Sequence, residues 1–165
     1  MINIYSDGAY SSSRDQGGWA FAFYKDDVLI KLKYDGLVST TNNRMEIMGC
    51  IKAMEFLKHN KITEPVTIFT DSMYVIGTMT KNWKMKKNTD LWPIMFGLMT
   101  PNIRFQHVKG HEGNVGNSLC DTWAVFSSHL EGCEIDLQPV INQCYVDNSG
   151  LDKTPPQTCF TFNFE

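Results

Sequence analysis

Four acidic residues stand at the edges of the elements that the sequence predicts: Asp7, Glu46, Asp71 and Asp121. Singly, each has an ordinary structural role, as a turn before Gly8, the back half of a capping box, a helix N-cap or an exposed helical position. Together they would repel one another unless cations neutralised them. Carboxylates without clustered Cys or His favour Mg²⁺ or Mn²⁺, and two such ions about 3.5–4 Å apart suit displacement at phosphorus. The four carboxylates are therefore candidates for a two-metal hydrolytic site.

The hydrophobic pattern predicts the elements that must position these carboxylates. It alternates in the strands and recurs every three to four residues in the helices. Asp26-Asp27 separates the second and third strands as a hairpin turn, and Pro65 separates the first helix from the fourth strand. The expected elements in chain order are strands 2–5, 18–25 and 28–34, helix 43–60, strand 66–69, helices 72–83 and 90–99, strand 103–108 and helix 116–129.

The order βββαβααβα indicates an α/β fold. Three consecutive strands without room for helices imply antiparallel neighbours, and the later β-α-β alternation implies parallel ones. We therefore expect a mixed five-stranded sheet, three antiparallel strands followed by two parallel ones, flanked by helices. Asp7 and Asp71 both end predicted strands and would share one sheet edge if those strands are parallel neighbours. Glu46 falls in the first turn of the first helix, and Asp121 in the first half of the last one.

Composition excludes several classes of protein. The chain has 165 residues, 42% of them hydrophobic and 20% charged, which excludes wholesale disorder. No apolar run approaches the roughly 20 residues of a membrane span, and Met1–Ile4 continues into polar sequence without a secretory leader. The cysteines are odd in number, scattered and without a C-x-x-C pair, which argues against a disulfide framework or a zinc site. We expect a cytoplasmic protein, or one in the host cytoplasm if the chain is viral.

Charge divides the chain into two parts. The net charge is −3, but residues 1–130 hold 14 Lys and Arg against 12 Asp and Glu. Residues 131–165 hold one Lys against six acidic residues. We interpret 1–130 as a catalytic domain and 131–165 as an acidic, irregular C-terminal extension that ends in a short alternating aromatic strand. Its acidity is expected to lie away from the motifs.

One basic run stands out within the first part. Residues 81–87 contain four lysines and a tryptophan, with Lys84, Lys86 and Lys87 close together. The run is typical of a solvated helix end. It is equally typical of a surface that binds a phosphate backbone, where cations and an aromatic ring occur together. Composition alone leaves both interpretations open.

Four blocks of sequence, in order, resemble the type 1 ribonuclease H family. They are Tyr-Ser-Asp-Gly at 5–8, Thr-Asn-Asn-Arg-Met-Glu at 41–46, Thr-Asp-Ser-Met-Tyr-Val at 70–75, and Val-Lys-Gly-His-x-Gly at 108–113 leading to Asp121. The resemblance covers about residues 1–130. It implies an RNase H-like fold and an endonuclease that hydrolyses the RNA strand of RNA–DNA hybrids.

The resemblance also implies roles for individual residues. Asp7, Glu46, Asp71 and Asp121 would bind two Mg²⁺ ions, with Mn²⁺ as a substitute, and the products would carry 5′-phosphate and 3′-hydroxyl ends. His111 corresponds to the family's mobile histidine, which assists proton transfer and product release. Its position between Gly110 and Gly113 suits a flexible loop.

Substrate contacts follow from the same resemblance. Gly8, Asn42 and Asn43 match positions that contact the minor groove, where a protein can detect the 2′-hydroxyl. Thr41 and Asn88 match positions that bind a phosphate of the DNA strand, with Arg44 in support.

The sequence also departs from the family pattern. A basic protrusion present in some members is shortened here to the run that holds Lys84, Lys86 and Lys87, so we expect weak intrinsic affinity for the hybrid. Met73 replaces a commonly polar residue, and the segment around Ser13 differs from the small Gly/Pro-rich loop that is usual in the family.

Two other functions compete with this one. A nuclease or integrase of the same fold could act on DNA, although the motif at 41–46 speaks against it. The second competing function is a hybrid-binding module without catalytic activity. The presence of all four carboxylates and His111 argues against it.

The sequence further suggests how such an enzyme would work in the cell. We expect a monomer that removes RNA primers or hybrids during DNA replication. Gln157–Phe162 loosely resembles the peptides that dock on sliding clamps, which makes a clamp a candidate partner. Packing of the terminal strand on the domain's own sheet is the interpretation of this extension that we favour.

Overall fold

The computed structural model describes residues 1–110, 113–136 and 160–163. Its elements are β1 (Ile2–Ser11), β2 (Gln16–Lys25), β3 (Val28–Val38), α1 (Asn42–His59), β4 (Val66–Thr70), α2 (Met73–Thr80), α3 (Trp92–Leu98), β5 (Ile103–His107), α4 (Val115–Ser127), β6 (Glu134–Ile135) and β7 (Phe160–Asn163). The order βββαβααβα is confirmed, with two further strands after it.

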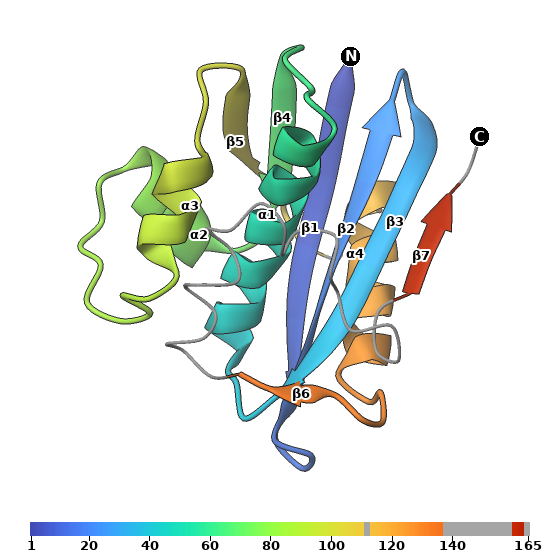
Figure 1. The fold of residues 1–165 in the computed structure, drawn as a ribbon, viewed down its shortest axis with the longest axis vertical. Helices are drawn as coiled ribbons and strands as arrows, with labels where there is room; N and C mark the ends of the chain where they lie inside the picture. Colours follow the sequence, from blue (N-terminus) through green and yellow to red (C-terminus); the bar gives the residue numbers. More distant parts are fainter. Residues whose placement is uncertain (111–112, 137–159, 164–165) are drawn as a thin grey trace.

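These strands form one mixed sheet (Figure 1). The strand order is β5-β4-β1-β2-β3-β6, and β7 pairs with β3 beside β6. Strands β1, β2 and β3 are antiparallel, whereas β4 joins β1 and β5 joins β4 in parallel. The predicted α/β fold with three antiparallel and two parallel strands is therefore confirmed.

The C-terminal extension adds the last two strands to the edge at β3. The expectation of irregular structure was wrong for Glu134–Ile135, because this dipeptide pairs in parallel with Leu37 and Val38 as β6. The aromatic strand expected at the C-terminus is present at Phe160–Asn163, antiparallel to β3. The edge of the five-stranded sheet is thus covered by the chain's own extension.

Helices cover both faces of the sheet because the side chains of its central strand alternate. Trp19, Phe21 and Phe23 of β2 pack in the core under α1, while Ala20 and Ala22 face α4 on the other side. In Figure 1, α1 lies in front of the strands and α4 behind them. The large side chains are on the α1 face and the small ones on the α4 face, so α4 can approach the sheet closely.

The first strand is longer than the sequence predicts. The prediction that the first strand ends at Asp7 was wrong, because β1 pairs with β2 from Ile2↔Lys25 to Ser11↔Gln16. Its other neighbour, β4, pairs with it only as far as Ser6↔Thr70. Asp7 therefore lies within β1, at the point where the parallel pairing on one side stops.

Helix ends explain two further differences. Thr41 is the N-cap of α1, and its hydroxyl accepts from the Arg44 backbone N–H at 3.1 Å. The capping box that would use Glu46 is therefore wrong, and Glu46 lies in the second turn. Helix α2 ends at Thr80 and not near Trp83, because Asn82 adopts a left-handed φ of 55° that Asn tolerates after a helix. Within the described residues, no helix is long and apolar enough to cross a membrane.

Candidate active site

Strand register places two of the predicted carboxylates side by side. The last parallel pair between β1 and β4 is Ser6↔Thr70. Asp7 and Asp71 are the residues that come directly after the two members of this pair. The buried β4 leads to Asp71, while Ser72 caps α2 by accepting from the Val75 N–H at 3.2 Å. Asp71 is therefore not the cap of the helix that follows it.

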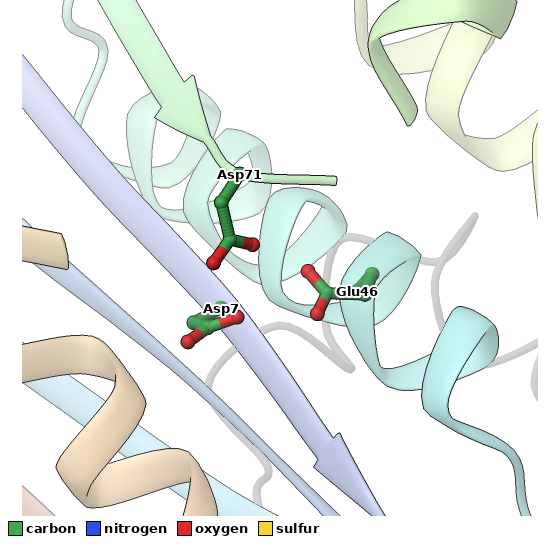
Figure 2. Close-up of side chains that lie close together, drawn as sticks. All are labelled: Asp7, Glu46 and Asp71. Atoms are coloured by element: carbon green, nitrogen blue, oxygen red, sulfur yellow. The ribbon is translucent and has the colours of Figure 1, made fainter. Parts of the chain in front are cut away.

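Close packing of α1 on β1 adds the third carboxylate. A Cβ on Gly8 would lie 2.4 Å from the Glu46 backbone nitrogen, so only glycine lets the helix approach β1 here. As a result, Asp7, Glu46 and Asp71 each offer an oxygen within 4.8 Å of the other two. Figure 2 shows the three side chains converging from β1, α1 and the end of β4. We call these three residues the carboxylate cluster.

The carboxylate cluster opens into a pocket of about 440 Å³. Asp121 of α4 lines the same pocket, so all four predicted carboxylates share one cavity. The other lining residues come from the α1 N-terminus, β1 and the start of α2: Gly8, Asn42, Asn43, Ser72, Met73 and Tyr74.

Electrostatics in the cluster favour the binding of a cation. Burial, followed by the negative charge of Asp71, raises the pKa of Asp7 to about 8. Burial and the charges of Asp7 and Asp71 raise the pKa of Glu46 well above its ordinary value. Among the described residues, no hydrogen-bond donor reaches the buried Glu46 Oε2. An oxygen without a partner and several converging acids fit a divalent metal ion.

Comparison with known proteins agrees with this geometry. The sequence model of the family described as RNase H matches residues 1–128. The chain belongs to the RNase H family. It is 37% identical over 137 residues to the ribonuclease H of Cyanothece sp., covering 75% of this chain and 87% of that protein. It is also 37% identical over 139 residues to the ribonuclease HI of Synechocystis sp., covering 75% and 85%. The predicted family and enzyme class, a ribonuclease H, are confirmed.

Solved structures show the same fold. The crystal structure of LC11-RNase H1 in complex with an RNA/DNA hybrid aligns with a TM-score of 0.68 at 20% identity, over 78% of this chain and 96% of that one. The structure of LC9-RNase H1 aligns with a TM-score of 0.63 at 23% identity, over 77% and 71%.

The predicted minor-groove residues lie at the mouth of the pocket. Gly8, Asn42 and Asn43 line it, and both asparagines are exposed in the first turn of α1. Thr41, also exposed, precedes them as the helix cap. Met73, which replaces a commonly polar residue, lines the pocket with 40% of its surface exposed. Their contacts with substrate remain predictions.

Arg44 and Asn88 lie beside this mouth in a different environment. The Arg44 side chain is only 5% exposed and forms ion pairs with Asp90 and Asp136. Burial lowers the pKa of its guanidinium, but the hydrogen bonds to these two carboxylates outweigh that effect and raise it. Arg44 Nη1 also donates to Asn88 Oδ1 at 3.3 Å. Arg44 therefore supports Asn88 from inside the protein.

The basic run forms an exposed loop between α2 and α3. It holds Lys84, Lys86 and Lys87, none of which lines the pocket. The interpretation of the run as a helix end fits Lys81 alone, which is the C-cap of α2. The Trp83 ring packs on α2 where Gly77 has no side chain. His111 lies outside the described residues, and its role remains a prediction.

The sequence analysis missed two residues near the site. Tyr74 lines the pocket and follows the Asp-Ser pair, so its position in that motif could have indicated it. Asp136 carried no such signal, because nothing local in the extension marks it as a partner of Arg44. The expectation that the extension's acidity lies away from the motifs was wrong for Asp136, whose carboxylate meets Arg44 at 2.7 Å.

Proposed function

We propose that this chain is a metal-dependent endoribonuclease that hydrolyses the RNA strand of RNA–DNA hybrids and leaves 5′-phosphate and 3′-hydroxyl ends. The observation that carries the proposal is the carboxylate cluster, with oxygens within 4.8 Å of one another, in one pocket with Asp121. The asparagines at the mouth of that pocket supply the donors and acceptors that a minor groove requires. The relatives are named as ribonucleases H, which supports the activity, and the structure of LC11-RNase H1 in complex with an RNA/DNA hybrid supports the substrate.

The carboxylates would hold the metal ions. Asp7, Glu46, Asp71 and Asp121 offer only oxygen ligands, which suits two Mg²⁺ ions, with Mn²⁺ as a substitute. When bound, such ions supply charge for the attacking and leaving oxygens of the phosphate. The protein's own part is to hold the acids close together at the end of β4. His111, which follows β5 in the sequence, would carry protons to and from the reacting oxygens.

Substrate selection would depend on the residues around the pocket. Asn42 and Asn43 would contact the minor groove beside the scissile phosphate, together with the backbone of Gly8. Thr41 and Asn88, with Arg44 in support, would bind a phosphate of the DNA strand. Lys84, Lys86 and Lys87 would add salt-dependent attraction to the backbone.

One assay tests the proposal against its competitors. The chain is incubated with end-labelled RNA–DNA hybrid, duplex DNA and duplex RNA, each with Mg²⁺ and with chelator. We expect cleavage of the hybrid's RNA strand alone, dependent on metal and lost in Asp71→Asn. Asp27→Asn is the matched control, because it makes the same chemical change in an exposed hairpin turn whose φ of 64° suits Asn.

Each competing function predicts a different result in that assay. Cleavage of duplex DNA would favour a DNA nuclease or integrase of the same fold. Binding of the hybrid without cleavage would indicate a silent binding module. Either result would overturn the proposal.

We further propose that the enzyme acts as a monomer in the cytoplasm, or in the host cytoplasm if the chain is viral, and removes RNA primers or hybrids during DNA replication. Sedimentation of the purified chain tests the oligomeric state. Accumulation of RNA-primed fragments in cells that lack the protein tests the role in replication.

A sliding clamp is the proposed replication partner. The segment Gln157–Phe162 would dock on it, and its last residues belong to β7, which pairs with β3. Clamp binding would therefore compete with that pairing. Recovery of the full chain on immobilised clamp should fall in Gln157→Ala. Equal recovery of both chains would exclude this segment as the docking site.

A further inference from the structure

The buried guanidinium of Arg44 is the centre of a charged group that joins three distant parts of the chain. Its Nε donates to Asp136 Oδ2 at 2.7 Å and its Nη2 to Asp136 Oδ1 at 3.0 Å. Its Nη1 and Nη2 donate to the two oxygens of Asp90 at 2.9 and 2.8 Å. With the bond from Nη1 to Asn88, every N–H of the guanidinium has an acceptor. We call Arg44, Asp90 and Asp136 the Arg44 cluster.

This arrangement leaves Arg44 no donor for substrate. A phosphate could bind its guanidinium only by displacing one of the two carboxylates, and the Asp136 side chain is fully buried while that of Asp90 is 10% exposed. Arg44 therefore acts through the groups that it holds. The group it holds nearest to the pocket is the carboxamide of Asn88.

Two contacts fix the Asn88 side chain. Its Oδ1 accepts from Arg44, and its Nδ2 donates to the hydroxyl of Tyr74 at 3.2 Å, which lines the pocket. Because Arg44 can only donate, Oδ1 must face it, and Nδ2 must face the pocket side. The guanidinium thereby sets the orientation of the Asn88 amide.

Asp136 reaches this group from the C-terminal extension, beyond the 1–128 range that the family model matches. Its backbone N–H donates to the Val38 carbonyl at 2.8 Å, directly after β6 pairs with β3. Its Oδ2 also accepts from the Thr40 hydroxyl at 2.9 Å, one residue before the α1 cap. In Figure 1, β6 runs past the end of β3, next to the start of α1. Asp136 thus contacts both the chain that leads to Thr41 and the side chain that orients Asn88.

We propose that Asp136 is a positioning residue for substrate binding, which holds Arg44 and the start of α1 so that Asn88 and Thr41 present their donors to one phosphate of the hybrid. The proposal rests on the proposed function. It assigns part of substrate binding to the extension, which reaches Arg44 through the buried carboxylate of Asp136.

Kinetics of Asp136→Asn on the labelled hybrid test this role. The substitution keeps the size of the side chain but turns one acceptor of the Arg44 fork into a donor. We expect KM to rise about 3- to 10-fold, the cost of one poorly made hydrogen bond, with kcat within about twofold. Asp35→Asn is the matched control, because Asp35 is equally buried on β3 and accepts from the Gly36 N–H at 2.7 Å. An equal rise of KM in this control would mean that general destabilisation is responsible, and would overturn the proposal.

A double-mutant cycle shows whether Asp136 acts through Asn88. In an Asn88→Ala background, Asp136→Asn should leave KM within about twofold of Asn88→Ala alone. Full additivity of the two effects would contradict the proposal. If Asp136→Asn melts below the assay temperature, Thr40→Val replaces it. This change removes only the Thr40 hydrogen bond and should raise KM about twofold, and an unchanged KM would again contradict the proposal.

The two proposals can fail separately. A wild-type chain that cleaves no hybrid would refute the proposed function. A wild-type chain that cleaves it, together with an Asp136→Asn variant of unchanged KM, would refute only the role of Asp136.

Discussion

The carboxylate cluster and the Arg44 cluster are both largely buried, with Asp71 and Asp90 partly exposed. Both include a residue from the first turns of α1, where Arg44 and Glu46 lie two residues apart. In the Arg44 cluster, every guanidinium N–H meets an acceptor on the protein itself. In the carboxylate cluster, acids face acids, and the buried Glu46 Oε2 has no hydrogen-bond partner among the described residues. One group is complete within the chain, whereas the other requires a cation from outside. This difference in completeness separates the group proposed to position substrate-binding residues from the group proposed to hold the metal ions.

The largest effect should come from Asp71→Asn. Loss of a metal-holding carboxylate should lower kcat on the hybrid by more than the 10- to 100-fold that an outer partner of a metal costs, roughly 1,000-fold or more. In the presence of chelator, the free energy of unfolding of the same variant should be about 1 kcal/mol higher than that of the wild type. The reason is that the negative charge of Asp71, which raises the pKa of Asp7, is gone. Urea titration measures this change. A variant that lost both activity and stability would indicate a structural cluster.

The next largest effect should come from Asp136→Ala. Removal of one partner from a buried ion pair leaves Arg44 partly unpaired and should lower the free energy of unfolding by about 3–5 kcal/mol. Glu134→Ala is the control, since Glu134 lies in β6, two residues before Asp136, is exposed and should change stability by about 0.5 kcal/mol or less. Equal losses in the two variants would show that the Arg44 cluster does not stabilise the fold.

Mg²⁺ should stabilise the chain through the carboxylate cluster alone. At a concentration about 100 times its Kd, the ion should add about 2.7 kcal/mol to the free energy of unfolding, because it binds the folded state. Thermal melting against MgCl₂ concentration measures this gain. The gain should vanish in Asp71→Asn and persist in Asp27→Asn. Persistence in both variants would place the metal elsewhere.

The smallest effect, taken per pH unit, should be the slope of stability against pH in the metal-free protein. Asp7 has a pKa of about 8 in the folded chain against 3.8 ordinarily, so the folded state holds its proton where the unfolded state has lost it. Stability should therefore fall as pH rises from about 4 to about 8, by at most about 1.4 kcal/mol per pH unit for this proton. Asp7→Asn should flatten the slope of urea midpoints against pH. A slope of the opposite sign would mean that Asp7 is held ionised.

The two clusters differ in how far the sequence predicts them. Asp71 was placed correctly, because the short buried strand predicted at 66–69 is present as β4 and ends just before it. Asp7 was placed beside it correctly, but β1 does not end there; it continues along β2 after β4 stops. The sequence spacing of Glu46 was compatible with a capping box. Only the N-cap observed at Thr41 excludes that role.

The Arg44 cluster could not be predicted in this way. Arg44 and Asp136 are 92 positions apart, and Asp136 stands in a segment whose composition resembles an irregular acidic tail. Nothing in the spacing of its neighbours marks it as buried. Its burial depends on the pairing of β6 with β3, and that pairing involves only Glu134 and Ile135.

The sequence by itself determined the order of the elements, because periodicity, turns and caps act over a few neighbouring residues. Its four motif blocks indicated the family and the set of four carboxylates. The tertiary structure alone decided which charges meet. Strand register set Asp7 beside Asp71, and the missing side chain of Gly8 brought Glu46 to them. The extension carried Asp136 to Arg44. Such meetings depend on contacts between residues far apart in the chain, which local patterns do not encode.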